Sequence, residues 1–289
     1  ALARLPLSGG LRRVRCCRAG IGTRLRRAAA GGDDGGMADL IHHVNAFRAA
    51  FARRQATETV ELPGAVVVRD REYPFSEEHN CLIVDGPQAD PAALPGLAAR
   101  HLGERRRYAI ATLDEEIGER AAPALAAAGY QREDLVLMAR DTAGCVLPEP
   151  AAVAAELAEL RDALLRQNLV WFPDEDSARQ LTDRRPVRLR GAEEVRFLAA
   201  RESDGRVAAW ADLYLDRRAG LAQVEDLVTA EAHRGRGHGD TLLGTALALA
   251  AAAGIPRLFL IADAEDWPRE WYARRGFTEI GRSHLFHGG

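Results

Sequence analysis

The 289-residue chain contains no lysine, and all 39 of its basic residues are arginines. This absence excludes the lysine Schiff base of pyridoxal-phosphate enzymes and a phosphate-binding loop that ends in Gly-Lys-Ser or Gly-Lys-Thr. Cysteine is scarce as well: Cys16, Cys17, Cys81 and Cys145 form no Cys-x-x-Cys pair, and the histidines are scattered. The sequence therefore supports neither a zinc site nor a disulfide framework. We expect no metal, and a reducing, cytoplasmic setting.

Long apolar runs are missing too. No run of about 18 apolar residues occurs, so we expect no membrane span. The chain does have 47 % hydrophobic and 28 % charged residues, which are ordinary values for a folded protein. Its length suits one large domain or two small ones, at roughly 100–200 residues per domain.

Residues 1–36 differ from the rest of the chain in charge and pattern. They hold eight arginines and two aspartates, a net charge of +6, whereas the whole chain is −3 and residues 37–289 therefore carry −9. The segment has no sustained helical or strand period, and its apolar stretches are too short for a signal-peptide core. We expect a disordered, non-native extension. The alternatives are a basic arm for nucleic acid and an organelle transit peptide.

Residues 37–289 divide into two halves, 37–141 and 151–289, joined by a linker at 142–150 that holds turn formers and two prolines. Apolar spacing predicts helices at 38–56, 91–101, 120–128, 151–167, 240–253 and 267–274. Short apolar runs predict strands at 65–68, 81–84, 108–111, 135–139, 195–201, 207–215, 222–228, 258–262 and 283–287. Each half ends with a helix, then a glycine and an aromatic residue (Gly129-Tyr130 and Gly276-Phe277), which indicates a tandem duplication.

The sharpest local pattern is Arg234-Gly-Arg-Gly-His-Gly239, between a predicted strand and a predicted helix. Three glycines let backbone N–H groups approach a ligand closely, and a helix N-terminus adds positive potential, so the loop suits a pyrophosphate. The spacing is Gly-x-Gly-x-Gly, and the strands before it form a meander, which argues against a dinucleotide fingerprint. Taken alone, such a loop is as readily a structural turn.

Together with its surroundings, the loop resembles the acetyl-CoA loop of the GNAT acyltransferase superfamily. The matching residues are Gln223-Val-Glu-Asp-Leu-Val-Thr229, His233-Arg-Gly-Arg-Gly-His-Gly239 and, downstream, Trp271-Tyr-Ala-Arg-Arg-Gly-Phe277. The resemblance is specific over 195–289, and over 37–141 it rests on the order of elements. It implies a mixed α/β GNAT fold of two GNAT-like lobes, with a central, mostly antiparallel sheet flanked by helices.

The resemblance also implies an acetyl-CoA-dependent N-acetyltransferase with acetyl-CoA as co-substrate. The residues that it implies for coenzyme binding are Leu227, Val228, Thr229, Arg234, Gly235, Arg236, Gly237, His238, Gly239 and Asp240. The Val228 N–H would polarise the thioester carbonyl. Tyr272 would protonate the departing thiolate; its alternative is a packed aromatic ring.

Glu225 is the candidate general base. Strand alternation predicts that Gln223, Glu225 and Leu227 lie on one face, so that only one of Glu225 and Asp226 faces the acceptor, and family position favours Glu225. The alternative is a carboxylate paired with an arginine. Asp266 is predicted to cap the helix that follows it.

The first half lacks both motifs, with Leu125 at the position that matches Tyr272, so we expect no catalysis there. Polar residues His79 and Asn80 suit either the cleft or a capped loop. Trp210 and Tyr214 share a face and suit either the acceptor pocket or the core.

We expect a small-molecule primary amine as acceptor, no nucleic acid or membrane partner, and a monomer or homodimer. The charge of −9 favours a cationic acceptor. Two alternatives of other classes are a non-catalytic acyl-CoA-binding or regulatory module and an interaction protein that uses the arginine-rich tail on nucleic acid.

Overall fold

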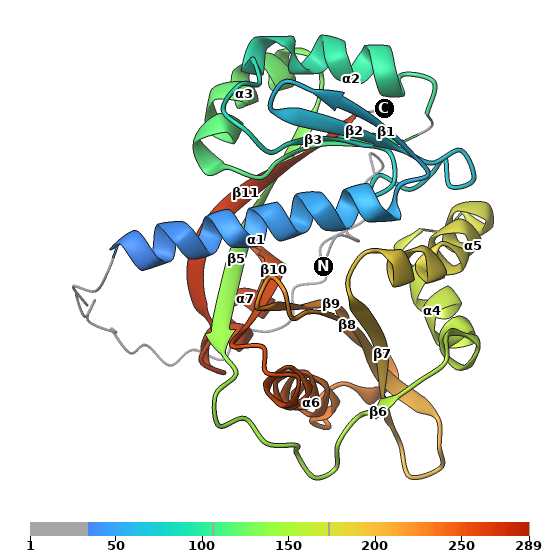
Figure 1. Cartoon of the computed structure of the whole chain (residues 1–289). Helices are drawn as coiled ribbons and strands as arrows, with labels where there is room; N and C mark the ends of the chain where they lie inside the picture. The colour runs from blue at the N-terminus through green and yellow to red at the C-terminus, as the bar shows by residue number, and fades with distance from the viewer. Residues whose placement is uncertain (1–33, 106, 173, 289) are drawn as a thin grey trace, which may run out of the picture.

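One continuous mixed sheet runs through the whole molecule (Figure 1). The computed structural model describes residues 34–105, 107–172 and 174–288. The sheet has 11 strands in the order β1-β2-β3-β4-β11-β5-β10-β9-β8-β7-β6. The strands are β1 (Glu58–Leu62), β2 (Ala65–Arg69), β3 (Cys81–Val84), β4 (Tyr108–Thr112), β5 (Gln131–Asp141), β6 (Val153–Ala154), β7 (Glu194–Arg201), β8 (Val207–Asp216), β9 (Leu221–Thr229), β10 (Arg257–Asp263) and β11 (Thr278–Gly288).

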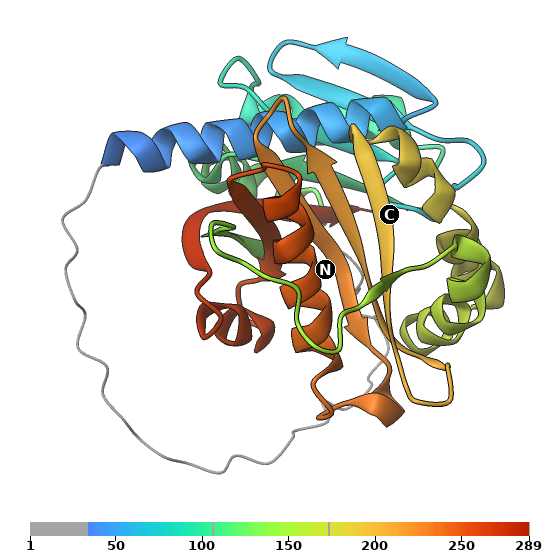
Figure 2. The ribbon, with the colours of Figure 1, turned by 60° about the horizontal axis from the view of Figure 1, so that its bottom comes forward.

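Helices cover both faces of this sheet (Figures 1 and 2). The α-helices are α1 (Asp34–Gln55), α2 (Leu94–Leu102), α3 (Glu115–Ala127), α4 (Leu157–Trp171), α5 (Glu175–Asp183), α6 (His238–Ala252) and α7 (Pro268–Ala273). Three short 3-10 helices are η1 (Pro91–Ala93), η2 (Arg185–Arg190) and η3 (Glu231–His233). The mixed α/β fold class predicted from the sequence is confirmed.

The two halves exchange their last strands. Each half has a parallel strand pair joined by a helix (β3-α2-β4 and β9-α6-β10), then a second helix, a glycine and a long strand. Gly129 and Gly276 take φ values of 89° and 82°, the left-handed conformation that ends a helix. Strand β11 then lies between β4 and β5, and β5 lies between β11 and β10. This common order supports the duplication inferred from the sequence.

Helix α1 crosses the exchanged strands β5 and β11 and contacts both halves (Figure 1). Phe47 and Phe51 pack against Phe259 and Tyr214 of the second half. Gly281 of β11 allows the helix to approach, because a Cβ there would lie 1.9 Å from Cδ1 of Ile41. The helix begins at Asp34, so the boundary predicted at 36/37 falls inside its first turn. Residues 1–33 of the predicted extension lie outside the described residues.

Helix α6 fills the opposite face of the second half. Leu242, Leu243, Ala246 and Leu247 are buried against the sheet. Burial of each leucine side chain contributes about 1.5–3 kcal/mol, so this face is a main source of stability in the second half. Within the parts of the chain that the structure describes, no helix is long and apolar enough to cross a membrane.

Several elements differ from the prediction. The helix predicted from residue 151 begins at Leu157, because Val153 and Ala154 pair with β7 as the short edge strand β6. Strand β1, helix α5 and η2 were not predicted. Helix α5 is polar, and Ala178 and Leu181 are its only apolar residues, too few to mark a helix in the sequence.

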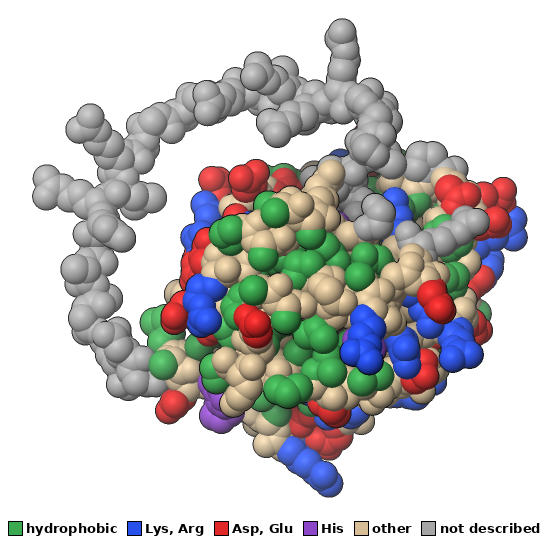
Figure 3. Space-filling view, turned by 90° about the horizontal axis from the view of Figure 1, so that it is seen from above, with side chains coloured by type: hydrophobic (Ala, Val, Ile, Leu, Met, Phe, Trp, Pro, Cys, Tyr) green, Lys and Arg blue, Asp and Glu red, His purple; other side chains and the backbone are tan. Residues whose placement is uncertain are grey.

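Figure 3 looks down on the molecule from the side of the first half. Basic and acidic side chains alternate around the margin of this face, and hydrophobic side chains gather nearer its centre.

Candidate functional site

The parallel strands β9 and β10 separate partway along their length. They pair at Arg257–Leu221, Leu258–Ala222 and Phe259–Gln223. Beyond these pairs, β9 continues against β8 as far as Thr229, while β10 continues against β5 as far as Asp263. The facing backbone edges are therefore unpaired with each other over 224–229. An unpaired strand edge is a place where an extended ligand can bind.

The equivalent pair in the first half stays closed. All four residues of β3 pair with β4, from Cys81–Ala109 to Val84–Thr112, and Leu113 N–H then donates to Val84 carbonyl. The first half therefore offers no comparable gap. This geometry agrees with its lack of both sequence motifs.

A β-bulge interrupts β9 at the separation. Asp212 pairs with Glu225 and Trp210 with Val228, so two residues, Asp226 and Leu227, stand opposite one on β8. Asp226 has a positive φ of 47°, which is rare for a residue with a side chain. The predicted alternation is therefore wrong beyond Glu225: the bulge lets Asp226 reach the same side of the sheet as Asp212 and Glu225.

Two buried arginines of η2 hold the bulge in place. Nη1 of Arg188 donates to Asp212 at 2.6 Å and to Asp226 at 2.7 Å, and Nη1 of Arg185 lies 3.2 Å from Asp226. Arg188 is 2 % exposed and Asp212 is 0 % exposed. Burial raises the pKa of Asp226, but Arg188 and Arg185 outweigh this effect and hold that pKa well below its usual range. The charges thereby balance the backbone strain at Asp226.

The same network reaches the first half. Glu78 accepts from Nη2 of Arg188 at 3.1 Å and pairs with Arg184. Burial raises the pKa of Glu78, but these two arginines outweigh it and hold that pKa well below the usual range. A charged residue of the first half is thus tied to the bulge of the second half.

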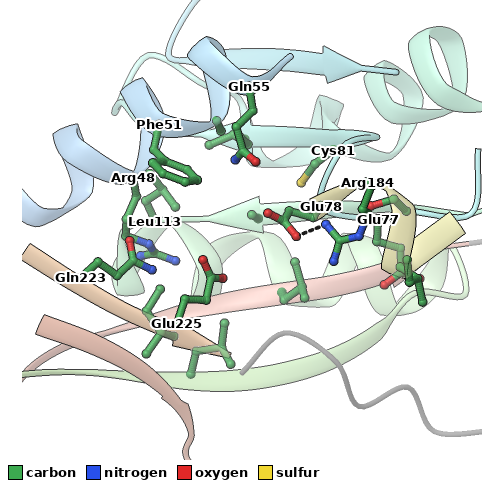
Figure 4. Close-up of a pocket in the computed structure, with 18 of the residues that line it drawn as sticks. Arg48, Phe51, Gln55, Glu77, Glu78, Cys81, Leu113, Arg184, Gln223 and Glu225 are labelled. Atoms are coloured by element: carbon green, nitrogen blue, oxygen red, sulfur yellow. Dashed lines mark hydrogen bonds and ion pairs between the residues drawn. The ribbon is translucent and has the colours of Figure 1, made fainter. Parts of the chain in front are cut away.

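A cleft lies between the two halves, in front of the strand separation (Figure 4). It contains about 1050 Å³ of empty space, part of it open to solvent. The first half supplies α1, the 75–78 loop and parts of β3 and β4. The second half supplies side chains near α4 and α5, together with Gln223, Glu225 and Ile261 of β9 and β10. Phe51, Leu113, Phe172 and Leu181 give it apolar walls.

Glu225 points into this cleft (Figure 4). Its side chain is 8 % exposed and has no hydrogen bond or ion pair with any of the described residues. Burial raises the pKa of Glu225, against the opposing field of Arg188. A raised pKa brings a carboxylate closer to the range in which it accepts a proton efficiently near neutral pH. The chemistry available to this group is proton transfer.

The glycine loop lies at the far end of β9 and leads into α6. Gly235 and Gly237 have φ values of 76° and 84°, and no atom lies within 4 Å of a Cβ added at either position. Helix α6 begins at His238. The open backbone and the helix N-terminus form the anion-binding geometry expected from the sequence.

Glu202 of the β7–β8 hairpin fixes the loop. One of its oxygens accepts from His233 at 2.7 Å, Arg236 at 2.8 Å and His238 at 3.2 Å. These contacts lower the pKa of Glu202 to about 2, with His233 the largest contributor. Asp240, in the first turn of α6, is paired with Arg275. The loop and the start of α6 are therefore held in place by side chains of two other segments, Glu202 and Arg275.

Tyr272 lies on the α6 side of the sheet, whereas Glu225 lies on the α1 side. Its ring packs between Trp271 and Phe277, in the apolar cluster that also holds Val224 and Leu227. Burial raises the pKa of Tyr272 to about 12. The two predicted catalytic side chains thus flank the strand separation from opposite sides. Leu227, Val228 and Thr229 lie along the unpaired part of β9.

The remaining alternatives are settled by packing. Trp210 and Tyr214 share a face, as predicted, and are buried in the core rather than in the cleft wall. Asn80 is bonded to the backbone of its own loop, and His79 pairs with Ser76 at 2.9 Å, so the capped-loop interpretation is correct. The cap predicted at Asp266 is wrong, because α7 begins at Pro268 after Trp267.

Several cleft residues had no signal in the sequence analysis. Arg48, Gln55, Glu78 and Arg184 come from elements far apart in the chain and belong to no motif. Cys81 also lines the cleft, but burial raises the pKa of its thiol to about 12, so it is a poor nucleophile. Among the described residues, no cluster of three or more His, Cys, Asp or Glu side chains suits a metal ion.

Comparison with known proteins identifies the second half. Residues 157–277 match the acetyltransferase (GNAT) family model, and this part of the chain is a GNAT acetyltransferase domain. The resemblance seen in the sequence is therefore confirmed, and the family's general chemistry is acetyl transfer from an acyl-CoA. Comparison with curated proteins gives no match.

Solved structures share the fold over most of the chain. A GCN5-related N-acetyltransferase from Kribbella flavida is 19 % identical, covers 86 % of this chain and 96 % of its own, and has a TM-score of 0.58. A functionally unknown conserved protein from Staphylococcus epidermidis is 13 % identical, covers 79 % and 92 %, and has a TM-score of 0.60. At these identities the likeness concerns the fold.

Proposed function

We propose that the chain transfers the acetyl group of acetyl-CoA to a primary amine of a small molecule bound in the cleft. One observation carries this proposal: the separation of β9 and β10 joins the glycine loop at one end to a cleft with a buried carboxylate at the other. A thioester that lies in the gap would reach the cleft, while its pyrophosphate would reach the loop.

The coenzyme would be held mainly by backbone groups. The N–H groups from Gly235 to Asp240 would bind the pyrophosphate, with Arg234 and Arg236 adding positive charge. The unpaired edge of β9 at 227–229 would hold the pantetheine as an added strand. The N–H of Val228 would donate to the thioester carbonyl oxygen, where negative charge develops.

Glu225 would take a proton from the ammonium group of the acceptor, directly or through one water. The freed nitrogen lone pair would form a bond to the carbonyl carbon, and the carbon–sulfur bond would break. The electron pair would leave with sulfur, which would take the phenolic proton of Tyr272. The nitrogen would lose its second proton to solvent as the amide forms. The products would be an amide, coenzyme A thiol and one released proton, with the Glu225 proton passing to Tyr272 through solvent.

The halves would have separate tasks. Residues 151–289 would bind the coenzyme and catalyse, and residues 37–141 would form a non-catalytic wall of the acceptor cleft. The closed β3–β4 pair supports this division.

Calorimetric titration of acetyl-CoA into the full chain tests the coenzyme site. We expect micromolar binding that is lost in Gly237→Glu, whose carboxylate would repel the pyrophosphate. Gly129→Glu is the matched control, because Gly129 has a similar φ of 89° and an equally open position. It imposes the same backbone cost of about 1–2 kcal/mol but should leave binding unchanged.

Release of coenzyme A thiol with a panel of primary amines then tests the transfer. Failure of acetyl-CoA to bind the wild-type chain would refute the proposal. Tight binding without transfer to any amine would instead support a non-catalytic acyl-CoA-binding module.

A further inference from the structure

Arg48 of α1 is the cation of the cleft that lacks a carboxylate partner in the described part of the chain. Its side chain is half-buried and points toward Gln223 and Glu225 (Figure 4). Its hydrogen bonds go to neutral groups, from Nη1 to Oδ1 of Asn45 and from Nη2 to Oγ of Ser283, each at 3.2 Å. A guanidinium has five N–H donors, so donors remain available for a ligand.

The other charges that line the cleft are matched within the protein. Glu78 pairs with Arg184 and Arg188. Glu77 accepts from Nδ1 of His287 at 2.8 Å. Two charges of the cleft have no such partner among residues 34–105, 107–172 and 174–288: the guanidinium of Arg48 and the carboxylate of Glu225.

Arg48 stays charged at neutral pH in spite of its surroundings. Burial lowers the pKa of Arg48 to about 10, while the field of Glu225 raises it. A cleft that holds one positive and one negative group favours a ligand with a negative group to face Arg48 and a positive group to face Glu225. A purely cationic amine would leave Arg48 uncompensated, and a half-buried charge without a partner is costly.

Gln55 provides a second, independent sign of a polar ligand. Its side chain is 3 % exposed and turns into the same cleft (Figure 4). Its Oε1 has no hydrogen-bond partner among the described residues. Buried polar atoms are nearly always bonded in native structures, so a ligand group is expected to complete this one.

We infer that the acceptor is an amine that also carries a carboxylate, with an apolar body: an amino-acid-like molecule whose carboxylate binds Arg48 and whose ammonium group faces Glu225. This inference rests on the proposed acetyl transfer and narrows its substrate class. It replaces the cationic acceptor that net charge favoured, because the local charges of the cleft decide which ligand fits. Phe51, Leu113 and Ile261 would contact the apolar body.

The test compares amines that differ by the carboxylate alone. Coenzyme A release is measured with leucine, leucinamide and 3-methylbutylamine, and with phenylalanine, phenylalaninamide and 2-phenylethylamine. We expect kcat/KM to be about 10- to 100-fold higher for the carboxylate-bearing member, the range of a charged hydrogen bond. Arg48→Met should remove this preference, and Arg48→Lys should keep part of it.

Arg53→Met is the matched control. Arg53 lies on the same helix but pairs with Glu61 and Asp85 and does not line the cleft. It should retain the full preference. The melting temperature and acetyl-CoA affinity of each variant show whether it has folded, and Arg48→Lys carries the test if Arg48→Met has not.

Calorimetric binding of the same molecules to the coenzyme A-loaded chain separates the two proposals. Carboxylate-dependent binding that Arg48→Met abolishes, with no turnover, would contradict the transfer and keep the ligand class. Equal binding and equal turnover of carboxylate-bearing and carboxylate-free members in the wild type would overturn the inference, as would a preference that survives in Arg48→Met.

Discussion

Replacement of Glu225 by glutamine tests the proposed chemistry most directly. The substitution keeps the shape of the side chain and removes its ability to take a proton. Loss of a general base lowers the rate by about 10²–10⁴-fold, which corresponds to about 3–5 kcal/mol in activation free energy. We expect kcat to fall by this factor while the affinity for acetyl-CoA stays the same, because Glu225 lies on the cleft side of β9.

The pH dependence provides a second measurement. Burial raises the pKa of Glu225 above its ordinary 4.5, in opposition to Arg188. The wild-type kcat should therefore rise with pH as Glu225 loses its proton, at a pH above that ordinary value. This part of the pH profile should be absent from Glu225→Gln.

Stability should change in the opposite direction to activity. When a carboxyl has a higher pKa in the folded protein than in the unfolded chain, folding favours its protonated form. The free energy of unfolding therefore falls as the pH rises from the unfolded pKa through the folded pKa. At pH 7 the charged Glu225 therefore destabilises the fold, and Glu225→Gln should melt at a higher temperature than the wild type. A structural ion pair would give the reverse result.

Glu231→Gln is the control, since Glu231 is exposed in η3 and its loss removes the same charge. The reasoning is refuted if Glu225→Gln retains kcat within threefold of the wild type, or if Glu231→Gln loses as much activity.

Further predictions concern the acid, the packing and a buried histidine. Tyr272→Phe should lower kcat by about 10–10²-fold with little change in melting temperature, measured by thiol release. Gly118→Ala should destabilise the fold by about 1–3 kcal/mol in urea unfolding, because its Cβ would lie 2.0 Å from Cδ2 of His284; Gly96→Ala, also in a helix but with open space around it, should stabilise it by about 0.5–1 kcal/mol. Burial lowers the pKa of His287, but two glutamates outweigh it and raise that pKa to about 9. In urea unfolding, His287→Gln should therefore lower the free energy of unfolding by up to about 3 kcal/mol at pH 6. This loss should become smaller as the pH rises from 6.5 through 9.

The open glycine loop that we propose for the coenzyme could be recognised in the sequence because its signals are local. The glycines at 235 and 237 are needed where the backbone takes a positive φ, and Gly239 lets Trp271 approach to 3.4 Å of an added Cβ. Such requirements act within a few residues of the chain. They are visible as a motif before the fold is known.

The bulge in β9 could not be predicted in this way. Alternation is the default for a strand, and Asp226 departs from it because Arg185 and Arg188 bind its carboxylate from a segment about 40 residues away. The motif places Glu225 and Asp226 side by side without showing which turns where. The strain at Asp226 is a tertiary effect, and so is its orientation.

The cleft that we propose for the acceptor could not be predicted from the sequence for a related reason. Arg48 and Glu225 are separated by more than half of the chain and meet because α1 crosses the exchanged strands β5 and β11. In the sequence, Arg48 lies on a predicted helix and belongs to no motif. Its proposed role in binding a carboxylate depends on the absence of a carboxylate partner in the described residues. That absence is a property of the folded cleft and is not visible in the sequence.

The exchange of β5 and β11 explains why a half without catalytic motifs would be retained. Because β11 lies between β4 and β5, and β5 lies between β11 and β10, loss of residues 37–141 would remove both neighbours of β11, expose the edge of β10 and open the cleft wall. The closed β3–β4 pair leaves that half without the strand gap that we propose for the coenzyme, while α1 and the 75–78 loop line the cleft that we propose for the acceptor. On this argument the second half would carry out the chemistry, through the gap and Glu225, while the first half would set the choice of amine, through Arg48 and Gln55.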